Sequence, residues 1–158
     1  MANILSNNEQ IGIDKAKSIR NKYKHIKNLS DIIFQICEDY QIKIKEAHKK
    51  SNTIYDFIND RYEITLSYNQ SKARDNFEIA LELGHILLNH SLTDNKLIYK
   101  PKSPEDIQAK GFALEFLLPK EIFIIKYNEL DRDVYKLAKY FEVSPALILV
   151  AMIMYKIK

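Results

Sequence analysis

The sequence predicts an α+β fold that is mainly helical and contains a small antiparallel sheet of about three strands. Its 158 residues and apolar fraction of 46% fit a single domain with one buried core. Only three glycines and four prolines are present, which excludes linker-rich chains and all-β designs with many turns. The apolar spacing is helical at first, changes to the two-residue period of strands, and then becomes helical again.

The N-terminal part of the chain predicts a loose terminus followed by two helices over residues 13–40. Residues 1–12 are polar and show no apolar period, so we expect no regular structure there. The second helix is expected from Asp31 to Tyr40, with Asn28 or Ser30 as its N-cap. The first helix has one apolar stripe, formed by Ala16, Ile19, Tyr23 and Ile26.

Residues 41–68 predict the sheet. Apolar residues alternate with polar ones in three short runs, at 42–45, 54–58 and 62–68. An Asn-Asp pair between the last two runs supplies turn chemistry. We expect strands of this kind to be apolar on one face only, as in an antiparallel sheet that packs on a core.

The helical spacing returns in the second half of the chain. One helix is expected over residues 71–90, and another from Pro104 to about Leu117, because proline fits the first turn after a Ser103 cap. The run from Ala146 to Tyr155 is apolar but only about half as long as a membrane span requires, so it predicts a core helix. The remaining helices are expected at 120–128, 133–141 and 145–155.

The composition also restricts the setting of the protein. Cys37 has no second cysteine to pair with, so no intrachain disulfide can form, and we expect it to be a small core residue. The chain does not begin with an apolar run of the kind that directs secretion. We therefore expect a cytoplasmic protein that does not bind membranes.

The net charge of +3 is small, but the first fifty residues carry ten Lys and Arg against six Asp and Glu. Lysines on one helix face are compatible with binding to nucleic acid or to an acidic partner. They are equally typical of the solvated face of an amphipathic helix, and the low overall charge favours that interpretation over direct nucleic-acid binding. The basic residues concerned are Lys15, Lys17, Arg20, Lys22, Lys24 and Lys27.

The most informative stretch lies in the helix expected over residues 71–90. Glu82 and His85 form the second half of the pattern H-E-x-x-H, in which two histidines bind zinc and the glutamate acts on the metal-bound water. Leu81 occupies the position of the first histidine. Taken by itself, E-x-x-H on an apolar helix usually means only a surface acid and a histidine at the edge of the core.

The residues around this pair resemble the zinc-peptidase helix of the ImmA/IrrE family, whose members typically read A-H-E-[LI]-G-H-[LI]-L-L. Residues 80–88 match that pattern except at Leu81. Residues 106–119 are similar to a second family motif, E-x-x-A-N-x-F-A-x-E-L-L-M-P, and residues 137–147 to L-A-x-x-F-x-V-S-x-x-A-L. The resemblance extends over most of residues 13–155.

The resemblance implies a zinc site made of a histidine at position 81, His85 and the carboxylate at position 106, with Glu82 as general base. Leu81 offers no lone pair, and Asp106 is one methylene shorter than the usual glutamate. Glu105 is the fallback ligand if the second motif is displaced by one residue. Because a catalytic zinc needs three protein ligands, we expect no metal or weakly bound zinc, and an idle Glu82.

No other histidine is an obvious replacement for the missing ligand. His90 follows His85 by five residues, and on a continuous helix that spacing places the two rings about 140° apart. We therefore expect His90 to be structural or exposed. His25 and His48 lie in other predicted elements, and the sequence does not place either of them near His85.

These observations lead to three hypotheses of function. The first is an ImmA/IrrE-like domain of impaired catalysis that regulates by binding a protein, such as a DNA-binding repressor of a prophage or mobile element, or a host factor. The second is an active zinc endopeptidase that cleaves a repressor with an unusual ligand set. The third is a nucleic-acid-binding module built on the basic helix at residues 15–27.

Overall fold

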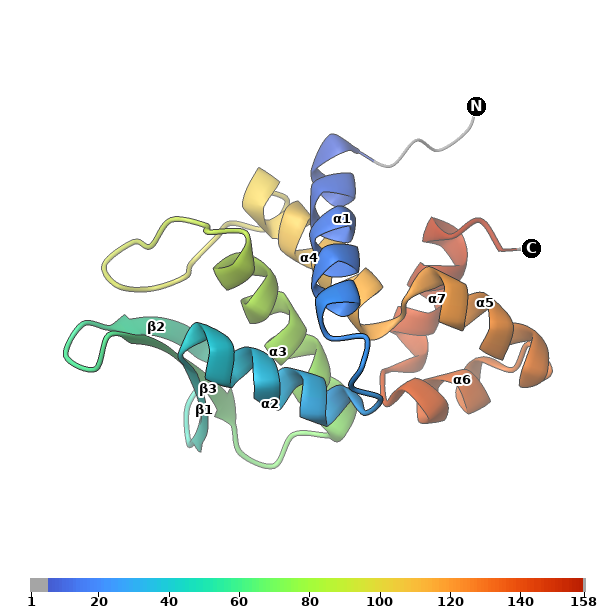
Figure 1. Cartoon of the computed structure of the whole chain (residues 1–158), viewed down its shortest axis with the longest axis horizontal. Coiled ribbons are helices and arrows are strands. Elements are labelled where there is room, and N and C mark those ends of the chain that lie inside the picture. Colours follow the sequence, from blue (N-terminus) through green and yellow to red (C-terminus); the bar gives the residue numbers. More distant parts are fainter. Residues whose placement is uncertain (1–5, 158) are drawn as a thin grey trace.

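The computed structural model describes residues 6–157, which form seven helices and one three-stranded sheet (Figure 1). The predicted α+β class with mainly helical content is confirmed. In chain order the elements are α1 (Asn7–Lys22), α2 (Leu29–Tyr40), β1 (Ile42–Ala47), β2 (Asn52–Asp56), β3 (Arg61–Ser67), α3 (Lys72–Leu87), α4 (Pro104–Leu117), α5 (Lys120–Glu129), α6 (Val134–Phe141) and α7 (Pro145–Met154).

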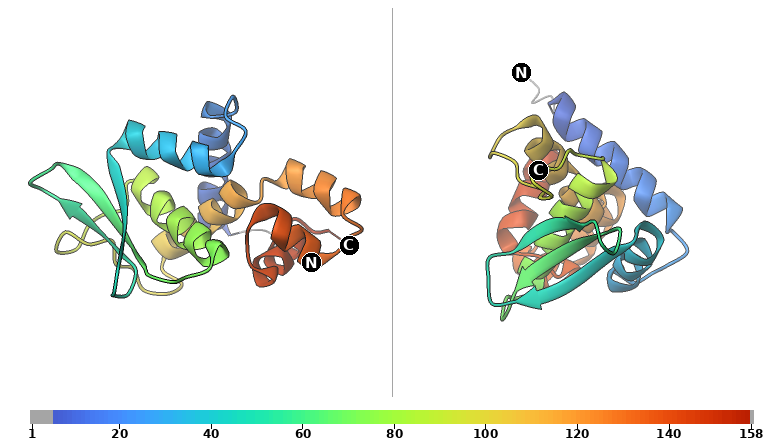
Figure 2. Two further views of the ribbon diagram at one scale, coloured as in Figure 1. Left: turned by 90° about the horizontal axis from the view of Figure 1, so that it is seen from below. Right: turned by 90° about the vertical axis from the view of Figure 1, so that its left-hand side faces the viewer.

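The helices α1, α4 and α3 form the centre of the molecule. Helix α1 lies along α4, and α4 packs in turn on α3 (Figure 1). The sheet and α2 lie on the other side of α3, whereas α5, α6 and α7 form a separate group at the far end (Figure 2). Buried apolar residues from all of these elements except β2 belong to one continuous core.

Helix α1 begins earlier than the sequence predicted. The Ser6 hydroxyl accepts a hydrogen bond from the Glu9 backbone N–H at 3.3 Å and caps a helix that starts at Asn7. The prediction of a loose terminus over residues 1–12 is therefore wrong for residues 7–12, and residues 1–5 lie outside the described part. The apolar spacing failed here because the buried position in this stretch is a glycine, Gly12.

The sheet is mixed and not antiparallel. Its strand order is β1-β3-β2, with β1 parallel and β2 antiparallel to β3. The strand β3 takes the centre because its residues 63–66 are all buried, which suits a strand with neighbours on both sides. The second strand also ends before the predicted residue 58, because Phe57 and Ile58 are exposed in the turn that follows β2.

The predicted starts of α4 and α7 are confirmed by their caps, and α2 uses Asn28, one of its two predicted caps, but begins at Leu29 instead of the predicted Asp31. The Asn28 side chain accepts from two backbone N–H groups of α2, and Ser103 and Ser144 each cap a helix whose first residue is proline. Cys37 lies half-buried on α2 against the core, and burial raises the pKa of its thiol to about 11. An unreactive packing role for Cys37 follows from this.

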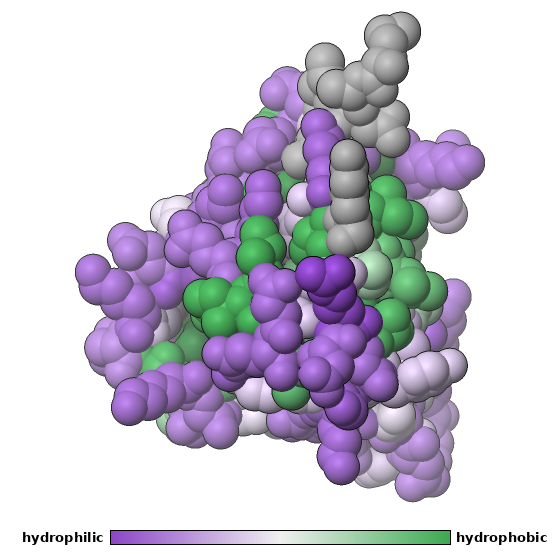
Figure 3. Space-filling view, turned by 90° about the vertical axis from the view of Figure 1, so that its right-hand side faces the viewer, coloured by the Kyte–Doolittle hydropathy of each residue, from purple (hydrophilic) through white to green (hydrophobic). Residues whose placement is uncertain are grey.

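Helix α7 is only partly a core helix. Ile148 and Ala151 are buried, but Leu149, Val150 and Ile153 are exposed, so the predicted core helix packs on the core with one face only. Figure 3 shows apolar side chains gathered on the face formed by the C-terminal helices. No single helix within residues 6–157 is long and apolar enough to cross a membrane, and the apolar pair α6 and α7 is bent by 103°.

The glycines of the chain lie where the central helices touch. A Cβ at Gly12 on α1 would collide with the Gln108 carbonyl and lie 2.6 Å from the Phe112 nitrogen of α4. A Cβ at Gly111 on α4 would lie 2.5 Å from the Glu9 carbonyl oxygen of α1. The two backbones therefore approach each other more closely than any residue with a side chain permits.

We predict that Gly12→Ala lowers the free energy of unfolding by about 3 kcal/mol, because the added methyl group forces α1 away from α4. Urea denaturation followed by circular dichroism measures this loss. The matched control is Ser18→Ala, at an exposed position of the same helix, which is expected to change stability by less than about 0.5 kcal/mol. Equal stability of the two variants would contradict the close contact.

Candidate functional site

The residues of the E-x-x-H stretch lie on α3, which begins at its Ser71 cap and runs beside the sheet. Leu81 is half-buried and packs against the core cluster. Glu82 is also half-buried, whereas His85 is only 8% exposed. The helix therefore places an apolar side chain, an acid and an imidazole within little more than one turn.

His90 lies against His85, although the sequence predicted that the two would point apart. Helix α3 ends at Leu87, and Asn89 adopts a left-handed conformation with φ of 57°. This turn brings the His90 backbone N–H to the His85 carbonyl at 3.0 Å, and the two Nδ1 atoms to 2.8 Å. The prediction was wrong because it assumed that the helix continues to residue 90.

The two histidines begin a chain of hydrogen bonds that links three helices. The His90 Nε2 atom lies 2.7 Å from Gln108 Oε1 on α4, and Gln108 Nε2 donates to Asn8 Oδ1 on α1 at 3.0 Å. The Gln108 oxygen can only accept, so His90 carries its proton on Nε2 and accepts at Nδ1. His85 therefore donates from Nδ1 and keeps a free lone pair on Nε2.

The surroundings keep His85 uncharged. The pKa of His85 is lowered to about 4, chiefly by burial and also by the nearby His90, although the carboxylates of Asp106 and Glu105 act in the opposite direction. The ring of Tyr99 stacks on the His85 ring with a centroid distance of 4.8 Å and an interplanar angle of 11°. His85 is thus a neutral imidazole held from two sides at pH 7.

The predicted carboxylate ligands make their contacts away from His85. Asp106 Oδ2 accepts from the Lys102 backbone N–H at 2.9 Å and pairs with Lys110 Nζ at 3.0 Å. Glu105 makes no side-chain hydrogen bond or ion pair within residues 6–157, and it acts on His85 through its charge.

The remaining histidines are not part of this site. The His48 ring lies 4.4 Å from the ring of Tyr68, beside the sheet. His25 is exposed in the turn that follows α1. The structure thus joins His90 to His85 and leaves the other two histidines elsewhere.

Glu82 faces the edge strand of the sheet. Its Oε2 atom and the hydroxyl oxygen of Thr53 on β2 are both buried, and neither has a hydrogen-bond partner in the described part of the chain. Burial raises the pKa of Glu82 to about 7, the Thr53 hydroxyl opposes the rise, and the charge of Glu78 adds to it. A carboxyl group of this kind is partly protonated at neutral pH.

A pocket of about 200 Å³ lies beside Glu82, between α3 and the strands β2 and β3. Leu81, Phe77 and Leu66 give it apolar walls, and Asn52 and Glu82 give it polar ones. This is the cleft between the sheet and the helix that carries E-x-x-H.

The segment between α3 and α4 closes the outer edge of β2. The Tyr55 backbone N–H donates to the Asn95 carbonyl at 2.8 Å, and the Leu97 N–H donates to the Thr53 carbonyl at 3.1 Å. Leu97 is buried, and Tyr99 of the same segment stacks on His85. We call residues 93–99 the strap, because they connect the edge of the sheet to the end of α3.

The donor atoms present do not fit a catalytic zinc site. His85 has one free lone pair, but Leu81 has none, and Asp106 is bound to Lys102 and Lys110. The Gln108 oxygen is neutral and already accepts from His90. Within residues 6–157, no three side chains of His, Cys, Asp or Glu are grouped to hold a metal ion.

Sequence reasoning missed Gln108 and Tyr99. Helical spacing on α4 does not separate Gln108 from Asp106, because residue 108 lies about 40° from Phe112 and residue 106 about 60° from Ala109, the two residues that meet Gly84 of α3. No local signal indicated Tyr99, because the strap has no regular period.

The sheet edge beside an E-x-x-H helix defines a metallopeptidase-like domain. The family model described as the IrrE N-terminal-like domain matches residues 37–152, and the chain belongs to that family. No curated protein matches the chain. A solved structure of a Mycobacterium tuberculosis transcriptional regulator has the same fold, with a TM-score of 0.64 and 14% identity. The similarity covers 89% of this chain and 49% of that one, so this chain spans about half the length of the regulator.

We predict that Glu82→Gln stabilises the protein at pH 8 by about 2 kcal/mol but has little effect at pH 5. Because the pKa of Glu82 is raised in the folded state, the native chain loses stability as the pH rises from 4.5 through 7. The lowered pKa of His85 makes stability increase as the pH rises from 4 to 6.5, and this effect is the same in the native chain and in the Glu82→Gln variant. Urea denaturation at the two pH values measures the difference.

The control for this experiment is Glu38→Gln, at an exposed position on α2. It removes the same charge without removing a buried carboxylate. An equal gain at pH 8 in both variants would mean that the net charge, and not the burial of Glu82, sets the pH dependence.

Proposed function

We propose that this chain is a regulatory member of the IrrE family whose peptidase site works without metal and binds a protein partner. The observation that carries the proposal is the hydrogen-bond chain from His85 through His90 to Gln108. In this chain the polar atoms nearest to His85, those of His90 and Gln108, form hydrogen bonds within the protein. With Leu81 at the first ligand position, Glu82 has no metal-bound water to deprotonate.

The cleft beside Glu82 supports binding without cleavage. It keeps an apolar wall at Leu81 and Phe77, and a polar border at Asn52 and Glu82. Six of the ten residues that line the cleft are polar or charged, which suits a polar side chain of a partner protein. The buried Oε2 atom of Glu82 offers such a side chain a hydrogen bond.

A partner segment that adds to the sheet has to displace the strap. The outward backbone groups at Thr53 and Tyr55 are already bound to Leu97 and Asn95. Strand addition therefore exchanges one set of backbone hydrogen bonds for another. The strap therefore competes with a partner strand for the backbone groups at the edge of β2.

The class of partner is proposed from the fold and from its relatives. The similar solved chain is a transcriptional regulator, and this chain matches about half of it. A DNA-binding repressor is the partner that this likeness suggests. The competing function is an active zinc endopeptidase with an unusual ligand set, and zinc binding distinguishes the two.

We predict that protein purified without chelators contains less than about 0.1 zinc per chain, because one histidine alone binds zinc weakly. Elemental analysis by mass spectrometry gives this ratio. One zinc per chain that is lost on His85→Ala would overturn the proposal and favour the endopeptidase. Zinc that remains bound after His85→Ala is bound at another place in the protein and agrees with the proposal that the site at His85 holds no metal.

Introducing metal-binding side chains at residue 81 and on α4 tests which residue of α4 could supply the third zinc ligand. We expect Leu81→His combined with Gln108→Glu to bind zinc at least tenfold more tightly than Leu81→His alone. The matched control is Leu81→His with Asp106→Glu, which lengthens the side chain that points toward Lys110. Tighter zinc binding by this control than by Leu81→His with Gln108→Glu would mean that residue 106 supplies the third ligand.

Protein binding is tested by placing a photo-crosslinking amino acid at Asn52, which borders the cleft, in cells that naturally produce the protein. We expect one protein adduct from this position and none from Lys43, an exposed position on the opposite edge strand β1. Mass spectrometry identifies the partner. Identical adducts from both positions, or none from Asn52, would count against a partner in the cleft.

A further inference from the structure

Arg20 is a half-buried cation without an ion partner. Within residues 6–157 its guanidinium makes no ion pair and no hydrogen bond, and its nearest aromatic contact is the Phe116 ring at 5.8 Å. The neighbouring Glu115 carboxylate is held by the Tyr155 hydroxyl at 2.7 Å and by the Lys120 N–H. Partly buried arginines are normally paired, so this one is available for a ligand.

Two pockets meet at Arg20. The first, of about 310 Å³, lies among the ends of α1 and α4 and the starts of α2 and α3, with α6 on one side. The second, of about 840 Å³, lies between the end of α1 and the start of α5. Arg20, Lys27 and Ile122 line both pockets, so the two adjoin, and we call them together the groove. Both volumes are in the range of small-molecule sites.

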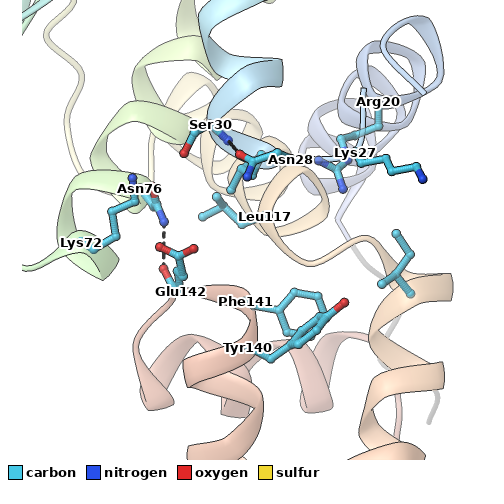
Figure 4. A pocket seen from close by; sticks show the side chains of 12 residues that line it. Arg20, Lys27, Asn28, Ser30, Lys72, Asn76, Leu117, Tyr140, Phe141 and Glu142 are labelled. Atoms are coloured by element: carbon cyan, nitrogen blue, oxygen red, sulfur yellow. Dashed lines mark hydrogen bonds between the residues drawn. The ribbon is translucent and has the colours of Figure 1, made fainter. Parts of the chain in front are cut away.

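The first pocket has two chemically different sides, which Figure 4 shows. Arg20 and Lys27 lie on one side, and Asn76 and Glu142 lie across from them. Asn76 is 3% exposed, and its amide donates to the Glu142 carbonyl at 2.9 Å, which leaves its own carbonyl oxygen free to accept. Lys72 joins the second side near Asn76.

Aromatic rings form the base of this pocket between its two sides. Tyr140 and Phe141 lie there with a centroid distance of 4.9 Å, and the ring of Phe141 also stacks on Phe123 of the core. A planar ring that enters the pocket therefore meets a ring held by the core. Stacking of this kind on an aromatic side chain is favourable and tolerates different bases.

The second pocket adds charge to the groove. Lys17, Lys24 and Lys120 line it together with Arg20 and Lys27, against the acids Glu115 and Glu121. A concave surface with an excess of cations focuses a positive potential and attracts anions. Burial lowers the pKa of Arg20, and the charge of the neighbouring Glu115 opposes this effect without forming an ion pair with it.

We propose that this groove binds a nucleotide, with its phosphates at Arg20 and Lys27 and its base against Phe141. The phosphates extend toward Lys24 in the larger pocket, where the remaining cations lie. The amino group of a base such as adenine donates to Asn76 and Glu142 on the opposite side. This site lies apart from the cleft at Glu82 and does not depend on the function proposed for it.

A nucleotide fits the groove better than a nucleic acid does. The cations are arranged around two concave pockets and are not spread along a flat face. Helix α1 ends at Lys22, so Lys24 and Lys27 do not continue the row of basic residues that a helical nucleic-acid surface would use. The net charge of +3 also gives little general attraction for a long polyanion.

The proposal is tested by calorimetric titration of the full chain with ADP, adenosine and inosine diphosphate. We expect ADP to bind at least tenfold more tightly than adenosine, because the phosphates bind the cations. Inosine diphosphate is expected to bind several-fold more weakly than ADP, since its ring carbonyl meets the acceptors of Asn76 and Glu142.

Variants of the groove residues distinguish specific binding of the nucleotide from non-specific attraction to positive charge. Arg20→Gln is expected to weaken ADP binding at least tenfold, and Lys27→Gln, at an exposed position, several-fold. The matched control is Arg132→Gln, which removes an exposed arginine over the Tyr127 ring and is expected to change affinity less than twofold.

Either of two results would overturn the proposal. One is the absence of ADP binding to the native chain, and the other is an equal loss of ADP affinity in the Arg20→Gln and Arg132→Gln variants.

Discussion

The structure depends on the close contact of α1 with α4. All three glycines of the chain lie at helix crossings, Gly12 and Gly111 between α1 and α4, and Gly84 between α3 and α4. The chain therefore uses glycine for close packing, while turns such as those at Gln41 and Asn89 use larger residues with positive φ. Because α1 lies so near α4, Asn8 reaches Gln108, and the polar chain that ends at His85 is complete.

A chain of hydrogen bonds connects the E-x-x-H helix α3 to α4, and it begins at the His85 side chain. In this protein the connection runs through His90 and Gln108, and it continues to α1 through Asn8. The chain of hydrogen bonds also gives the buried His85 imidazole a partner, and a buried imidazole without one would destabilise the fold.

Much of the fold could be predicted because its signals are local. The caps at Asn28, Ser103 and Ser144 act within one turn, and the helical spacing covers most helices. The parallel pairing of β1 could not be predicted, because it depends on which strand becomes central. In the candidate site, Glu82, Leu81 and His85 were found by pattern. Gln108 is linked to His85 through His90, which follows the end of α3, and Tyr99 stacks on His85 from an irregular segment, and no short pattern encodes either contact.

The strap has a consequence for how copies of this protein meet one another. A three-stranded sheet has two edges, and a bare edge invites pairing with the same edge of another copy, the first step toward aggregation. Here Asn95 and Leu97 pair with one edge, and the other, β1, carries Lys43 and Lys45. By pairing with the edge of β2, the strap protects the protein against self-association. Other chains can pair with this edge only when the strap leaves it.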